Sequence, residues 1–158
     1  RMSHVVCVMS SSGNPAMPRP AASELAPPDD VDDTQALVAY LTDMLGEHTS
    51  PAFPTPEADR AAMARRIAAR NYHPQGIVRQ MAAAIADGSL VDRLKDIAVP
   101  FMVIHGTDDT LIDIACGEDS AANVGHAVWR PVGGMGHDIG PGLEREIGPD
   151  ILAFLGTD

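Results

Sequence analysis

The sequence has few aromatic residues, few basic residues and only two cysteines. Phe, Trp and Tyr make up 4% of the 158 residues, so an apolar core has to be built mainly from aliphatic side chains and Met. The excess of Asp and Glu over Lys and Arg gives a net charge of −11, which argues against binding to nucleic acid or to an anionic membrane surface. The spacing of Cys7 and Cys116 suggests neither a zinc site nor a disulfide framework. We expect both to be small buried residues of a cytoplasmic protein.

Long apolar runs are also absent. No run approaches the roughly 20 residues that a membrane-spanning helix requires, so we expect no membrane partner. The first residues lack the basic-then-apolar layout of a signal peptide. The chain starts at Arg1, almost directly in an apolar run, and we interpret this start as a cut through a longer chain.

Short apolar runs and helical periodicity predict an α/β protein. Three runs predict strands at residues 4–9, 101–104 and 127–132, and we expect the first two to be buried. Helical spacing of apolar residues predicts helices over about residues 33–46 and 75–87, and Thr-Pro-Glu at residues 55–57 predicts the start of a helix that runs to about residue 70. We expect further helices over about residues 91–97 and 115–124. A last helical stripe at residues 143–155 is expected to break or restart at Gly148-Pro149. The alternation of strands and helices at the end of the chain implies a parallel sheet with right-handed crossovers.

Two motifs follow the second and third predicted strands. The first is His-Gly-Thr-Asp-Asp at residues 105–109, and the second is Gly-Gly-Met-Gly-His-Asp at residues 133–138. Because ligands bind at the carboxyl ends of strands in open parallel sheets, we expect Asp109 and His137 to converge on one site. A carboxylate placed there would hold the imidazole in one tautomer, and the imidazole would take a proton from a serine hydroxyl.

As a pair, these motifs resemble the acid and base segments of the α/β-hydrolase family, specifically its serine hydrolases and esterases. Residues 94–109 look like the strand that delivers the triad acid, and residues 134–137 look like the histidine loop. The resemblance implies the C-terminal part of an α/β-hydrolase fold. Its core would comprise residues 1–15 and 98–158, and residues 16–97 would form a helical cap. Asp109 would be the acid and His137 the base, with His105 a packing or hydrogen-bonding residue.

The sequence departs from the family in one respect, because the nucleophile motif G-x-S-x-G is absent. Ser10, Ser11 and Ser12 follow a predicted strand, but they lack the flanking glycines and the immediate helix of a nucleophile elbow. The family's chain order is Ser, then Asp, then His. The resemblance therefore implies that the serine and the oxyanion hole belong to a missing N-terminal segment. The expected partner is that companion segment or a second copy of the chain.

The expected function is hydrolysis of a small-molecule carboxylic ester without a cofactor or a metal. Amide, epoxide or halide chemistry are alternatives, since the fold does not fix the reaction. A non-catalytic binding or assembly module derived from the fold is a further alternative. Asp109 could also be a simple turn residue, since Gly-Thr-Asp-Asp is good turn chemistry, and His137 could be a structural loop histidine.

Overall fold

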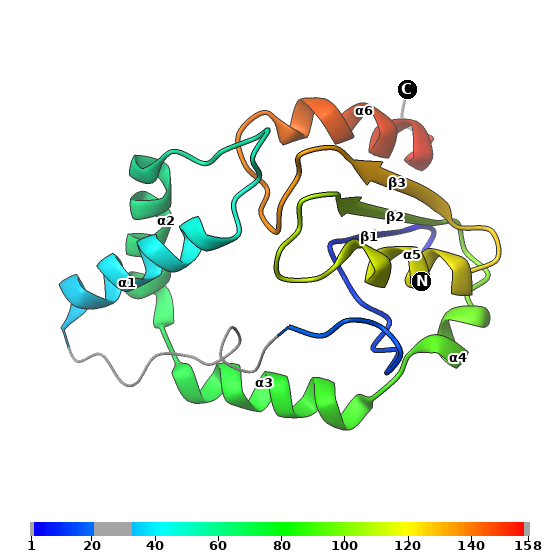
Figure 1. Ribbon diagram of the computed structural model, residues 1–158, viewed down its shortest axis with the longest axis horizontal. Coiled ribbons are helices and arrows are strands. Elements are labelled where there is room, and N and C mark those ends of the chain that lie inside the picture. The colour runs from blue at the N-terminus through cyan, green and yellow to red at the C-terminus, as the bar shows by residue number, and fades with distance from the viewer. Residues whose placement is uncertain (1, 21–32, 157–158) are drawn as a thin grey trace.

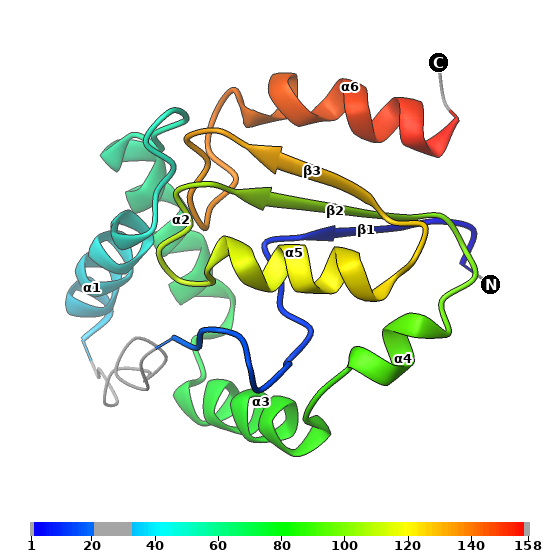
Figure 2. The ribbon, with the colours of Figure 1, turned by 45° about the vertical axis from the view of Figure 1, so that its right-hand side comes forward.

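The computed structural model describes residues 2–20 and 33–156, which form a parallel sheet with helices on both of its faces. The elements in chain order are β1 (Val5–Val8), α1 (Thr34–Glu47), α2 (Glu57–Asn71), α3 (Pro74–Asp87), α4 (Val91–Lys95), β2 (Phe101–Gly106), α5 (Ile114–Asn123), β3 (Val128–Val132) and α6 (Leu143–Leu155). In Figure 2, α6 lies on one face of the sheet and α5 on the other. No helix within the described residues is long and apolar enough to cross a membrane.

The sheet has the strand order β1-β2-β3, with both pairs parallel. All six residues of β2 are buried, because this strand has a neighbour on each side and a helix over each face. The expectation that residues 4–9 form a strand buried on both faces is wrong, since every residue of β1 is only half-buried. Within the described residues β1 pairs with β2 alone, which leaves its other edge uncovered. Cys7 is half-buried for the same reason, whereas Cys116 in α5 is buried as expected.

Side chains of β2 alternate between two apolar clusters, as the pleat of a strand requires. Met102 and Ile104 pack with α6 residues, and Phe101 and Val103 pack on the opposite face with Val124. Burial of each such side chain contributes roughly 1.5–3 kcal/mol relative to leaving it exposed. The two clusters fix β2 as the central strand, and its carboxyl end is where the first motif begins.

The predicted break at Gly148-Pro149 is wrong, because α6 runs without interruption through Pro149. Proline removes one backbone hydrogen bond of the helix and is usually destabilising there. The turns before and after Pro149 are both held by packing, since Leu143, Ile147 and Ile151 all join the cluster on that face of the sheet. The Arg130 guanidinium also binds both Glu146 and Asp150, at 2.8 and 2.5 Å, and so spans the proline.

The helices α1, α2 and α3 lie apart from the sheet faces, whereas Leu94 of α4 packs on the cluster around Phe101 and Val103. α1 and α2 pack on each other through Leu37, Leu41 and Ala64, and both lie beyond the carboxyl ends of the strands (Figure 1). α3 is largely exposed, and Pro74 is its one buried residue. The ends of β2 and β3, with the two motifs that follow them, thus face α1 and α2. Each predicted helix and strand has a counterpart in the structure.

Candidate active site

The two sequence motifs meet at the carboxyl ends of β2 and β3. Because these strands are parallel neighbours, the loops that follow them start at the same edge of the sheet. Nδ1 of His137 lies 2.8 Å from Oδ2 of Asp109. The structure thus brings together the two residues that the sequence selected.

Asp109 is a buried carboxylate whose two oxygens have different partners. Oδ1 accepts hydrogen bonds from the backbone N–H groups of Leu111 and Ile112, at 2.9 and 2.8 Å. Oδ2 faces His137 and also lies 3.3 Å from Nε2 of His105. One oxygen therefore shapes the turn while the other binds histidine, so the turn geometry and the histidine contact coexist.

These partners decide the charge of Asp109. Burial alone would raise the pKa of this carboxyl, but hydrogen bonds from His105, His137 and the Ile112 backbone outweigh it. The pKa of Asp109 is held well below its usual range. Asp109 is consequently ionised at neutral pH, as the group that orients and charge-stabilises a histidine must be.

His105 is fully buried beneath the acid, and its hydrogen bonds fix its tautomer. Nε2 lies 2.9 Å from the carbonyl oxygen of Ile112 and 3.3 Å from Asp109, and both groups accept hydrogen bonds, so Nε2 carries the hydrogen. Burial lowers the pKa of His105, but the Asp109 carboxylate and the Ile112 carbonyl more than offset this and leave the pKa raised. Nδ1 has no hydrogen-bond partner among the described residues. A Cβ atom at Gly117 would collide with this nitrogen, so the ring fits only against a glycine.

The contact with Asp109 fixes the tautomer of the partly exposed His137 ring. Because Nδ1 faces an ionised carboxylate, it carries the hydrogen in the neutral ring and leaves a lone pair on Nε2. The His137 side chain is 26% exposed, whereas the Asp109 side chain is fully buried. Nε2 makes no hydrogen bond to the described part of the chain. The pair therefore consists of a buried carboxylate and a partly exposed imidazole.

Comparisons with known proteins agree with this architecture. A non-heme chloroperoxidase from Streptomyces lividans is 34% identical over 74 residues, which is 46% of this chain and 27% of that protein. An esterase from Rhodococcus sp. superposes with a TM-score of 0.62 at 17% identity, over 99% of this chain and 57% of the esterase. A bromoperoxidase from Bacillus anthracis superposes with a TM-score of 0.66 at 17% identity, over 98% of this chain and 58% of the bromoperoxidase.

The chain has the α/β-hydrolase fold. It corresponds to the C-terminal portion of these structures and spans a little over half of their length. No protein-family profile matches the sequence.

Ser12, which follows β1, has structural partners. Ser12 is 1% exposed, and its hydroxyl donates to Asp119 at 2.5 Å and accepts from the backbone N–H of Asn14 at 3.1 Å. The Asn14 side chain donates to the other oxygen of Asp119 at 2.8 Å. Ser12 therefore connects the segment after β1 to α5. Its buried hydroxyl is occupied by these hydrogen bonds and is not available as a nucleophile.

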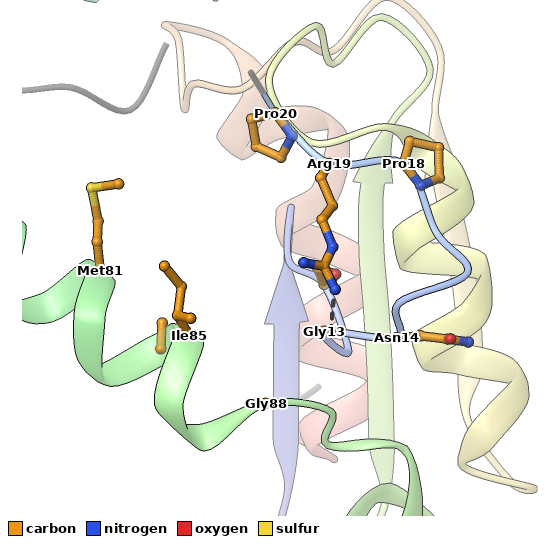
Figure 3. A pocket seen from close by; sticks show the side chains of 10 residues that line it. Gly13, Asn14, Pro18, Arg19, Pro20, Met81, Ile85 and Gly88 are labelled. Atoms are coloured by element: carbon orange, nitrogen blue, oxygen red, sulfur yellow. Dashed lines mark hydrogen bonds between the residues drawn. The ribbon is translucent and has the colours of Figure 1, made fainter. Parts of the chain in front are cut away.

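A cavity of about 460 Å³ lies between α3 and the segment that follows β1. Figure 3 shows Met81 and Ile85 of α3 facing the loop that carries Arg19 and Pro20 across this space. Residues 18–20 also line a neighbouring hollow of about 450 Å³, whose other wall includes Asp109. Apolar side chains of α3 thus line a cavity that adjoins the hollow beside Asp109.

Nothing in the described residues forms a metal site, because no three His, Cys, Asp or Glu side chains cluster in a suitable way.

Sequence reasoning missed Asp138, Ser50 and Thr55, which lie next to His137 or contact its loop. Asp138 directly follows the selected histidine, but a single Asp in a glycine-rich loop gives no signal of its partners. Ser50 lies in a polar connection between two predicted helices and Thr55 at the expected start of the second, and such residues are common at both places.

Proposed function

We propose that this chain supplies the acid and the base of a Ser-His-Asp triad in a carboxylic-ester hydrolase. The observation that carries the proposal is the 2.8 Å contact between Nδ1 of accessible His137 and Oδ2 of buried, ionised Asp109 at the carboxyl ends of adjacent parallel strands. The fold is that of a family built around this arrangement. Asp109 is the orienting acid, and His137 is the general base and then the general acid.

The proposed reaction follows from the two protonation states of His137. Nε2 takes the serine proton as the serine oxygen forms a bond to the ester carbonyl carbon, and Asp109 stabilises the resulting imidazolium. His137 then returns that proton to the leaving alkoxide, which departs as an alcohol. Water repeats the sequence on the acyl-enzyme, releasing the carboxylic acid and restoring the serine.

The serine and the oxyanion hole are proposed to come from a companion polypeptide segment. The sequence contains no G-x-S-x-G, and Ser12 is committed to Asp119. The chain also spans only a little over half of the hydrolase structures that it matches. The half-buried strand β1, which pairs only with β2 within the described residues, offers an edge for a further parallel strand.

Residues 16–97 are proposed to act as a helical cap over a core of residues 1–15 and 98–158. The cavity between α3 and residues 11–20 is lined by apolar Met81, Ala84 and Ile85 and adjoins the hollow beside Asp109. Such a lining suits an apolar acyl or alkyl group of a small-molecule ester. Met is well adapted to irregular ligand shapes.

The test is intact mass spectrometry after treatment with a serine-directed fluorophosphonate. The tagged chain is purified together with any companion polypeptide, in the wild-type form and as His137→Ala. The expected result is a labelled companion with the wild-type chain and at least a hundredfold slower labelling with the variant, because the general base is gone. Equal labelling rates with both chains, or no labelled polypeptide in a sample that contains the companion, would contradict the proposal.

A further inference from the structure

One short segment between α1 and α2 contacts both loops of the candidate site. This segment, residues 48–55, is called the clamp segment below. The His48 carbonyl accepts a hydrogen bond from the backbone N–H of His137 at 2.8 Å. The His48 ring also lies 2.9 Å from the hydroxyl of Thr110, next to Asp109. In both ribbon views this connection runs beside the loop that follows β3 (Figures 1 and 2).

Asp138 is the main attachment point of the clamp segment. Its Oδ1 accepts hydrogen bonds from the backbone N–H and the hydroxyl of Ser50, at 2.7 and 2.5 Å. Its Oδ2 accepts the hydroxyl of Thr55 at 2.9 Å. Asp138 makes no ion pair within the described residues. The negative charge of its carboxylate is therefore stabilised by hydrogen bonds from the clamp segment.

Ser50 connects the residues on both sides of His137. Its side chain has no exposed surface, and its hydroxyl both donates to Asp138 and accepts from the backbone N–H of Gly136 at 2.9 Å. Its single O–H donor is used, and one of its two acceptor lone pairs is occupied. Residues 136 and 138 are therefore both bound to one clamp residue, with His137 between them.

Glycines allow the histidine loop to approach the clamp segment closely. A Cβ atom at Gly136 would lie 2.7 Å from the carbonyl oxygen of His48, and one at Gly140 would collide with the carbonyl oxygen of Phe53. Backbone atoms on the clamp side cannot move aside as a flexible side chain can. The approach is therefore a specific backbone fit.

We propose that Asp138 is a positioning residue, through which the clamp segment holds His137 against Asp109. The inference rests on the proposed function, because it concerns the competence of the same acid–base pair. Displacement of the clamp segment frees both neighbours of His137 and lets the ring leave Asp109. The proposed cap therefore controls whether the base is in place, in addition to covering the substrate.

The experiment measures hydrogen exchange of the His137 Nδ1–H proton by NMR on the full 158-residue chain. The proton is assigned by its loss in His137→Gln. In wild type we expect a slowly exchanging proton held by Asp109. In Asp138→Ala we expect exchange to be at least about tenfold faster, as loss of hydrogen bonds to a charged group implies.

Two variants separate positioning from general stability. Asp138→Asn should retain slow exchange, since its amide oxygen still accepts from Ser50 and the Thr55 hydroxyl can turn to accept from the amide. Asp119→Ala is the matched control, because it removes a carboxylate that accepts two side-chain hydrogen bonds, from Ser12 and Asn14, away from His137. It should leave the exchange rate unchanged.

Equal exchange in Asp138→Ala and Asp119→Ala would overturn the inference and leave the proposed function standing. A wild-type proton that is not slowed, or one unaffected by Asp109→Asn, would overturn both. If Asp138→Ala does not fold, Thr55→Val carries the test, because it removes one donor to Asp138 and keeps the side-chain shape. About threefold faster exchange is then expected, and an unchanged rate overturns the inference.

Discussion

The acid and the base of the candidate site are held in different ways. Asp109 is bound by His105, Leu111 and Ile112, which all lie within four residues of it in the chain. The loop of His137 is bound by Ser50 and Thr55, which lie 88 and 83 positions from Asp138. The acid is thus fixed by its own strand and turn, whereas the base depends on a distant segment. Disruption of the connection between α1 and α2 should accordingly displace His137 more readily than Asp109.

The largest expected effect comes from removing the contact between the Asp109 carboxylate and the His137 ring. Asp109→Asn keeps the shape of the side chain but cannot hold His137 with Nδ1 protonated in the same way. We expect fluorophosphonate labelling of the companion to slow by roughly 10⁴-fold, as loss of the orienting carboxylate does in serine hydrolases.

Asp108→Asn is the matched control for that measurement. Asp108 is the exposed neighbour and accepts hydrogen bonds from Thr107 and Gly134, without contacting His137. With this variant, the rate at which the companion is labelled should stay within about twofold of the wild-type rate. A loss comparable to that of Asp109→Asn would show that the wrong carboxylate has been assigned.

Two glycine variants separate the acid side from the base side. Gly117→Ala pushes against His105 beneath Asp109, and Gly136→Ala pushes against the backbone of the clamp segment. Each should lower the free energy of unfolding by about 1–3 kcal/mol, measured by urea denaturation. Only Gly136→Ala should make residues 48–55 more susceptible to limited proteolysis.

Gly148→Ala provides the control for these variants, because a Cβ atom there meets open space. The higher helix propensity of Ala is opposed by its Cβ beside Pro149, so the free energy of unfolding should change by less than about 1 kcal/mol. Increased proteolysis of residues 48–55 in Gly117→Ala would contradict the separation of the two sides.

Low pH should lower the free energy of unfolding through protonation of Asp109. Its folded-state pKa is depressed, so its stabilising contribution is present above the unfolded-state pKa of about 3.9 and is lost as pH falls through the folded value. The free energy of unfolding, measured from pH 6 down to pH 3, should therefore fall more steeply in wild type than in Asp109→Asn. Parallel curves would show that Asp109 carries no such linkage.

The smallest effect is expected at the side-chain contact between the Asp109 loop and the clamp segment. The Thr110 hydroxyl meets the ring of His48 at an exposed position. Thr110→Val should cost less than about 1 kcal/mol of unfolding free energy and leave the His137 proton exchange unchanged. A larger loss would mean that the acid, too, depends on the clamp segment.

The same difference explains what the sequence could and could not predict. Asp109 and its turn were predictable because a buried strand, a glycine and two acids follow one another in the chain. The meeting of Asp109 with His137 followed from the parallel order of two adjacent strands. Asp138 and Ser50 were not predictable, because their contact joins positions 88 apart and each residue is ordinary in a loop.

The errors in the predicted fold have the same origin. Local chemistry at Pro149 favours a helix break, but packing of Ile147 and Ile151 on the sheet and the Arg130 ion pairs override it. The apolar run at residues 4–9 gave the right strand and the wrong burial, because burial depends on what lies beside the strand. Long-range packing decided each of these outcomes.

The close fit of Gly136 and Gly140 against the clamp backbone has a consequence for building chimeras. The proposed helical cap of residues 16–97 would be the obvious unit to exchange in such a chimera. Here a cut at the ends of residues 16–97 would carry residues 48–55 away from the loop they were shaped to fit. A transferable unit has to include residues 133–140 together with the insertion, so the exchangeable module is discontinuous in the chain.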